Sequence, residues 1–147
     1  MAVVLMGLAI VSLLAANGAF TKANAEGTAL STAEFLVEQI KELTALLPVV
    51  DPDTGTSVFG SEEATLAGYD DLDDFDGKSF SPPINADRAT LNGLGAFTQQ
   101  ITVENVNPAN FEQVIADHAS SFVKVTVKVL LDTRQISSSS WIRAECE

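Results

Sequence analysis

Residues 1–20 read MAVVLMGLAIVSLLAANGAF, and the first charged side chain is Lys22. A stretch of this length and composition favours one apolar helix, and it just reaches the roughly 20 residues that a bilayer requires. Its apolar positions lie on all sides of the helix, so the segment needs apolar surroundings all round. We therefore predict that residues 1–27 form a hydrophobic helical tail for assembly or membrane insertion.

The helical pattern continues beyond this tail, but it becomes amphipathic. Apolar residues now recur at steps of four and three, the spacing of one helix face, at Ala29, Ala33, Leu36, Ile40, Leu43 and Leu47. Pro48 ends the pattern, because proline lacks a backbone N–H and cannot continue a helix. This second half needs only a sheet to cover its apolar stripe.

An acidic segment follows, beginning at the turn signal Asp51-Pro52-Asp53-Thr54-Gly55. Nine acidic residues and no Lys or Arg lie between Asp51 and Asp76. Such density suits calcium, which takes six to eight oxygen ligands, but Leu72 and Pro83 occupy the positions where an EF-hand loop needs acidic ligands. We predict a solvated acidic loop pinned by apolar side chains, with calcium as the alternative. The pinning residues would be Tyr69, Leu72 and Phe75, and the alternative ligands Asp70, Asp71, Asp73, Asp74 and Asp76.

The C-terminal part reads as strands. Residues 97–106 alternate loosely, residues 111–118 fit a short helix or an extended crossover, and valines alternate with Lys124, Thr126 and Lys128 in the clearest strand. A tight connection at 132–134 leads to a returning strand at 135–144. We predict an α+β fold in which the long N-terminal helix packs on a small antiparallel meander. The head, residues 28–147, then contains the amphipathic helix half, an acidic loop at 48–96 and a sheet at 97–147.

Composition restricts the possible functions. A formal net charge of −12 with eight Lys and Arg argues against nucleic-acid binding, which needs a positive field. His118 is the single histidine, and the sequence lacks nucleophile-elbow, phosphate-loop and haem-attachment motifs, so we predict no enzyme. Cys146 is the single cysteine and cannot form an intrachain disulfide. Ser137 to Ser140 fit O-linked glycosylation or a polar strand near a sheet edge, and we favour the strand.

The order of these parts resembles the type IV pilin superfamily, which comprises bacterial filament subunits and the pseudopilins of secretion systems. The similarity covers nearly the whole chain: apolar helix, amphipathic continuation, loop and C-terminal meander. The segment YDDLDDFDG at 69–77, followed by Ser81-Pro82-Pro83, is most similar to minor pilins of the pilus-modification type. Pilins of this superfamily carry a glutamate at the fifth mature position, whereas this chain has Leu5. Either the mature N-terminus lies upstream of Met1, which we favour, or the chain has lost this glutamate.

The resemblance implies a structural subunit of an extracellular pilus-like filament. Such subunits wait in the inner membrane, are extracted by an assembly platform, and pack their helices in the core of a helical homo-oligomer at the cell surface. Adhesion, motility, secretion and DNA uptake all remain open, as do major and minor subunit roles. The assembly contacts that we predict are Val3, Val4, Leu5, Leu8, Ile10, Val11, Leu13 and Leu14.

Two alternatives remain from other classes. The chain would serve as a pseudopilin, a moving part of a type II secretion-like machine, if the filament stays short. It would be a secreted binding module if the N-terminal segment is an export signal. The segment has a small-residue site at Ala23-Asn24-Ala25 but lacks the basic region that usually begins such signals.

Overall fold

The computed structural model describes residues 2–53 and 55–145, except the side chains of Ala2, Val3 and Leu5. The chain forms two compact units, residues 1–32 and residues 33–147. Helix α1 (Ala2–Thr44) supplies the first unit and the N-terminal element of the second. A long N-terminal helix with a C-terminal antiparallel sheet confirms the predicted α+β class.

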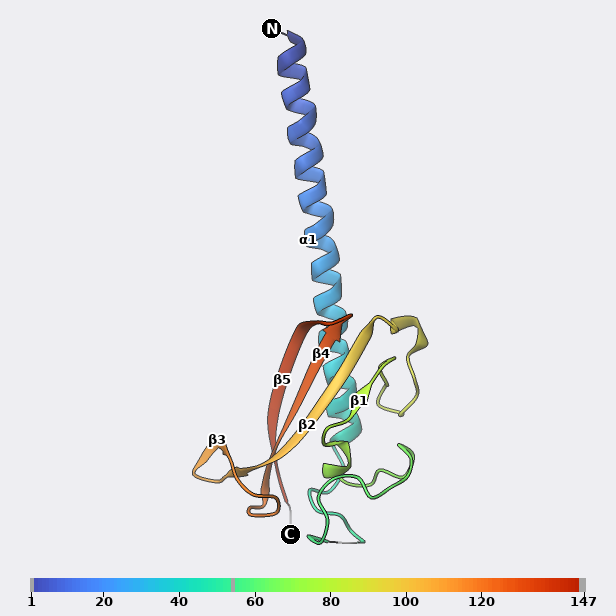
Figure 1. The fold of residues 1–147 in the computed structure, drawn as a ribbon, viewed down its shortest axis with the longest axis vertical. Helices are drawn as coiled ribbons and strands as arrows, with labels where there is room; N and C mark the ends of the chain where they lie inside the picture. The colour runs from blue at the N-terminus through green and yellow to red at the C-terminus, as the bar shows by residue number, and fades with distance from the viewer. Residues whose placement is uncertain (1, 54, 146–147) are drawn as a thin grey trace. The chain divides into compact units, whose positions relative to one another are not determined.

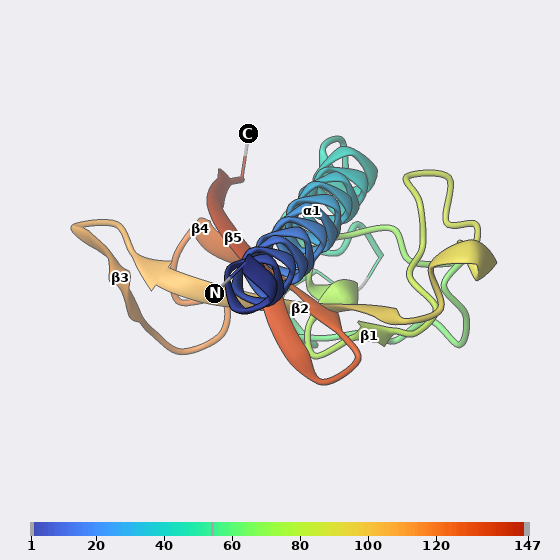
Figure 2. The same ribbon diagram turned by 90° about the horizontal axis from the view of Figure 1, so that it is seen from above.

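The second unit is built around a five-stranded antiparallel sheet with the path β1-β2-β4-β5 (Figure 1). β3 pairs with the end of β2 outside this path. Seen from above, β3 lies at the left and the segment between β1 and β2 at the right, toward opposite ends of β2 (Figure 2). The elements after α1 are η1 (Asp73–Phe75), β1 (Ser79–Phe80), η2 (Asn92–Leu94), β2 (Phe97–Asn107), β3 (Asn110–Val114), β4 (Phe122–Leu131) and β5 (Arg134–Ala144).

The predicted strands β2, β4 and β5 are confirmed, with the connection at 132–134. For residues 111–118 the sequence allowed either a short helix or an extended crossover. In the structure their first part is extended, as strand β3. The sequence did not predict β1, which is two residues long and lies inside the loop assigned to 48–96. Antiparallel pairing of β2 with β4 and of β4 with β5 forms the meander.

The core of the second unit lies between the end of α1 and one face of the sheet. Alternate residues of β4 point inward, because successive strand side chains face opposite sides, and the strand valines are at most 1% exposed. The helix contributes the apolar stripe that the sequence predicted. Its fully covered members are Ala33, Leu36 and Ile40, and those of β4 are Val123, Val125, Val127 and Val129.

Two polar side chains fasten the helix to the sheet. Gln99 of β2 is fully buried, and its Nε2 donates to the Leu36 carbonyl at 2.9 Å and to the Ile84 carbonyl at 3.1 Å. Arg143 of β5 donates from Nη1 to Thr44 O at 2.7 Å and from Nη2 to Leu47 O at 2.9 Å. The last carbonyls of a helix have no partner within the helix, so Arg143 gives Thr44 O a donor and ties the turn that follows α1 to β5.

Candidate functional site

The first candidate site is the apolar surface of the tail. The predicted assembly residues with described side chains are each exposed by 59–71%. At 3.6 residues per turn these positions point to several sides of the helix. They are Val4, Leu8, Ile10, Val11, Leu13 and Leu14, joined by Met6 and Phe20, which the sequence-based set omitted. The side chains of the other two predicted contacts, Val3 and Leu5, lie outside the described residues.

Within the tail, hydroxyl side chains do not add free donors to this apolar surface. Thr21 donates to the Asn17 carbonyl at 3.0 Å, and Ser12 donates to Leu8 O in the same way; Thr28 and Thr32, just after the tail, do so at 2.9–3.0 Å. The helix is long and apolar enough to cross a membrane, although signal sequences near an N-terminus meet the same criterion. The tail surface therefore suits an oily environment, whether lipid or protein.

The second candidate site is a set of carboxylates in the loop between α1 and β1. The structure brings together Asp70, Asp71, Asp73 and Asp74 with three acids that the sequence-based ligand set did not include: Asp51, Glu62 and Glu63. We call these seven residues the acidic cluster. Ligand atoms of Asp51, Glu63 and Asp70 lie within 4.8 Å of one another, as do those of Glu62, Glu63 and Asp74.

Asp76 plays a different part from the other predicted ligands. Its Oδ1 accepts the Val103 N–H at 2.8 Å, which ties the end of η1 to β2. Asp76 also follows the short helix that carries Asp73 and Asp74. Its interaction with β2 is therefore structural and helps to hold the preceding carboxylates in place.

Burial distinguishes this cluster from a solvated loop. Asp71, Asp73 and Asp74 are at most 1% exposed, so the prediction of a solvated acidic loop is wrong for these three residues. The predicted apolar pins are correct, because Leu72 and Phe75 are fully buried and Tyr69 is 8% exposed. Asp71, Asp73 and Asp74 adjoin these buried apolar residues in and next to the short helix η1. Burial of the apolar side chains therefore also places the neighbouring acids in the interior.

Several buried carboxylate oxygens of the acidic cluster accept no hydrogen bond from an N–H or hydroxyl group, and their polar neighbours include other carboxyl groups. Both oxygens of Asp73 are in this position, as are Asp71 Oδ2, Asp74 Oδ1, Asp70 Oδ1 and Glu63 Oε2. Two other oxygens do accept backbone amides: Asp71 Oδ1 from Asp74 N at 3.0 Å, and Asp74 Oδ2 from Asp70 N at 2.8 Å. Buried polar groups are normally satisfied, so these oxygens require an explanation.

The crowding raises the pKa values of the carboxyl groups. Burial, followed by the charge of Asp71, raises the pKa of Asp73 to about 8. A hydrogen bond with the Asp74 carboxyl raises the pKa of Glu63 to about 7, and burial raises the pKa of Asp71 to about 6. Burial also raises the pKa of Asp70. In each case the ionised form is disfavoured because charge is desolvated or placed beside like charge.

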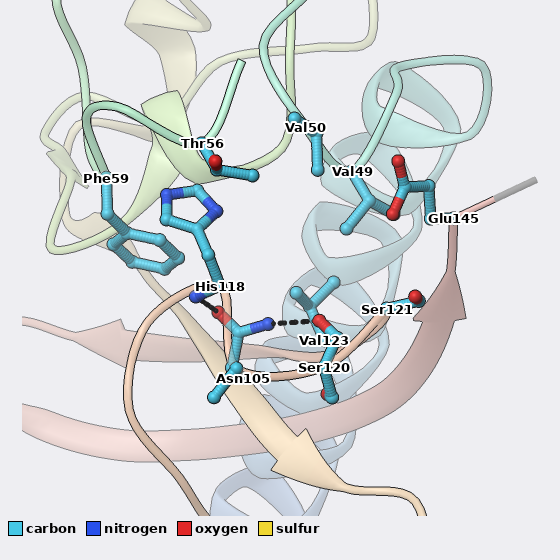
Figure 3. A pocket seen from close by; sticks show the side chains of 11 residues that line it. Val49, Val50, Thr56, Phe59, Asn105, His118, Ser120, Ser121, Val123 and Glu145 are labelled. Carbon is cyan, nitrogen blue, oxygen red and sulfur yellow. Dashed lines mark hydrogen bonds between the residues drawn. The ribbon is translucent and has the colours of Figure 1, made fainter.

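A third feature is a pocket of about 270 Å³ beside His118 (Figure 3). His118 Nε2 lies 2.8 Å from the Val58 carbonyl, and its ring packs edge-on against Phe59 at 5.3 Å between centroids. The Asn105 side chain accepts the His118 backbone N–H at 2.8 Å and donates to Ser120 O at 2.9 Å. The histidine thus joins the loop after α1 to the segment before β4, which is a structural role.

The remaining sequence candidates fall on β5 and beyond. Ser138, Ser139 and Ser140 are exposed on β5, and the Ser140 hydroxyl lies 3.0 Å from that of Thr126 on β4. This arrangement fits the predicted polar strand, and glycosylation stays a prediction. Cys146 lies outside the described residues.

Searches of family models, curated proteins and solved structures return no match for this chain.

Proposed function

We propose that this chain is a structural subunit of a type IV pilus-like filament, in which tails of neighbouring copies pack together. One observation carries the proposal: the described apolar side chains of the tail are about two-thirds exposed on several sides of one helix. An amphipathic helix could be covered by a single sheet, whereas a helix that is apolar all round needs neighbours on every side. Copies of the same helix supply such neighbours.

The energy available from this packing is large. Full burial of one aliphatic or aromatic side chain contributes roughly 1.5–3 kcal/mol. Burying the exposed tail residues would therefore yield on the order of 10 kcal/mol per subunit before the entropy lost on association. A head-to-tail contact that does not close on itself continues into a fibre. Tail packing can thus drive filament growth by the same physics that folds a core.

The proposal includes a membrane stage and a surface stage. Before assembly, the tail would reside in the inner membrane, where its length and composition suit the bilayer. An assembly platform would then transfer subunits into an extracellular filament whose heads face solvent. The acidic composition of the chain, with a net charge of −12, would keep these heads soluble.

A charge placed in the tail tests the proposal. We expect Leu8→Asp to abolish filaments, because a buried unpaired carboxylate among packed tails is strongly unfavourable. The matched control is Leu46→Asp in the second unit, since Leu46 is 96% exposed. Filaments sheared from cells that produce each variant would be counted by negative-stain electron microscopy, and the protein level would be measured by immunoblot.

The outcomes separate the candidate functions. Filaments from wild type and Leu46→Asp, but not from Leu8→Asp, support the proposal, provided that Leu8→Asp accumulates and melts like wild type in detergent. Normal filaments from Leu8→Asp would refute it. Short fibres restricted to the cell envelope would instead indicate a pseudopilin, and a secreted monomer without its tail would indicate a binding module.

A further inference from the structure

We propose that the acidic cluster is a calcium site. Its carboxylates would share a Ca²⁺ ion, with Glu63 at the centre because it belongs to both groups of converging ligands. The inference is independent of filament assembly, since every residue involved lies in the second unit.

The geometry of the cluster suits an oxygen-binding cation. Calcium binds oxygens at 2.3–2.6 Å, so two ligands on opposite sides of one ion are about 5 Å apart. The ligand atoms of Asp51, Glu63 and Asp70 lie within 4.8 Å of one another, and so do those of Glu62, Glu63 and Asp74. The three carboxylates of either group therefore lie close enough to contact a single ion, and waters would complete its coordination.

Burial is the second, independent observation. Asp74 is 1% exposed, its Oδ1 accepts no hydrogen bond from an N–H or hydroxyl group, and the residue belongs to the converging group with Glu62 and Glu63. Asp73 is also 1% exposed, and both its carboxylate oxygens lack such a donor. A buried carboxylate without a partner is costly. A divalent cation would satisfy these oxygens and cancel the repulsion among them.

The described basic side chains near the cluster do not supply this compensation. Arg88 reaches the same loop, but its guanidinium donates to the carbonyls of Leu66, Ala67 and Tyr69 at 2.6–2.9 Å. Lys78 lies 5.3 Å from the centre of the Tyr69 ring, in a cation–π position. The ion pairs Lys22–Glu26, Lys41–Glu38 and Lys124–Glu104 do not involve the buried Asp73 or Asp74.

Ligand chemistry favours calcium over other common metals. The converging ligands are carboxylates, whereas zinc sites usually include cysteine or histidine. Magnesium demands near-ideal octahedral geometry and keeps several waters, while calcium accepts many carboxylates in irregular arrangements. The cluster draws on three separate stretches of the chain, at 51, 62–63 and 70–74. A bound ion would therefore clamp the long loop onto itself.

The test uses the full chain in a non-ionic detergent, with CaCl₂ alone as the probe. We expect titration calorimetry to detect binding, and the melting temperature in calcium to exceed that in EDTA by roughly 10 °C at a hundredfold excess over Kd. Asp73→Asn should weaken calcium binding about tenfold or more, because an amide is a weaker and uncharged ligand in place of a carboxylate. Asp87→Asn, at an exposed position, is the matched control and should leave both measurements unchanged.

A spectroscopic measurement locates the ion. Tyr69 adjoins Asp70 and is the single tyrosine of the chain, so terbium bound in the cluster should emit when tyrosine is excited. Calcium should displace this signal, and Tyr69→Phe should reduce it without weakening calcium binding. Glu63→Gln, at a half-exposed position, provides a second ligand variant if Asp73→Asn does not fold, and it should show the same loss of calcium affinity.

Each result bears on the proposal. Binding that Asp73→Asn or Glu63→Gln weakens and Asp87→Asn preserves would support a calcium site. An absence of heat and of thermal stabilisation up to roughly 5 mM calcium, beyond the range of extracellular calcium modules, would overturn it. Equal calcium binding by Glu63→Gln and wild type would overturn it as well. Filament defects would not affect this test, since it measures binding by the isolated chain.

Discussion

At the scale of single residues, the unusual feature of this protein is the burial of carboxyl groups, of which Asp73 is an example. Its pKa is raised to about 8, chiefly by burial, so without a cation it is mostly protonated at neutral pH. The proton and the proposed calcium ion are thus two ways to neutralise the same charge. Metal binding should release protons and strengthen as the pH rises.

The pH dependence of stability follows from these shifts. The pKa values of Asp71, Glu63 and Asp73 are raised to about 6, 7 and 8 in the folded protein, above the ordinary carboxyl range of about 4. The folded state therefore holds more protons than the unfolded state between these limits, and stability falls as the pH rises. We expect the melting temperature in EDTA to fall by several degrees between pH 5 and pH 8.

Two comparisons check this pH prediction, both by circular-dichroism melting in detergent. Asp73→Asn should flatten the profile, because the group with the highest of the three pKa values no longer titrates. Asp87→Asn should retain the wild-type slope. A melting temperature that rises from pH 5 to pH 8 in EDTA would contradict the assignment of raised pKa values to these carboxyl groups.

At the scale of elements, the sequence identified those with a strong local period. The valine alternation predicted β4, and the spacing of Ala33, Leu36 and Ile40 predicted the buried helix stripe. The two-residue β1 has no such period, because it exists through pairing with β2. The sequence predicted only part of the acidic cluster. The acids at 70–74 are adjacent in the sequence, whereas Asp51, Glu62 and Glu63 approach them only when the loop folds back. The excess of acids throughout 51–76 was the available signal.

Gln99 offers a test of how elements are joined. Its amide links β2 to α1 through Leu36 O, and to the loop through the Ile84 N–H and carbonyl. Gln99→Ala should reduce the free energy of unfolding by about 2–4 kcal/mol, since buried donors and acceptors would lose their partners. Urea unfolding of the full chain in detergent measures this loss. The exposed neighbour Gln100→Ala should change stability by less than about 0.5 kcal/mol, and equal effects of the two variants would contradict this role.

At the scale of the whole molecule, one set of apolar residues forms the folded core and another set is available for association. The buried apolar side chains of the structure lie from Ala33 onward, within the second unit, while the described apolar residues of the tail are exposed. Folding of the second unit and association through the first therefore draw on different residues. A substitution in one unit can thus impair its own process and spare the other.

Removal of the tail tests this division. A chain that begins at Thr28 should be a folded monomer in water, because the core residues and the links from Gln99 and Arg143 all remain. Its melting temperature should lie within a few degrees of that of the full chain in detergent. Size-exclusion chromatography and circular dichroism measure both properties. An unfolded or aggregated fragment would show that the tail contributes to folding.

The hydroxyls of the tail have a consequence for its passage between environments. Ser12 and Thr21 each donate to a carbonyl of the same helix, so these hydroxyls need neither water nor a neighbour as acceptor. A subunit that moves from the lipid bilayer into a bundle of identical helices therefore keeps these hydrogen bonds. These two hydroxyls therefore do not oppose the movement of the tail from lipid to a filament core.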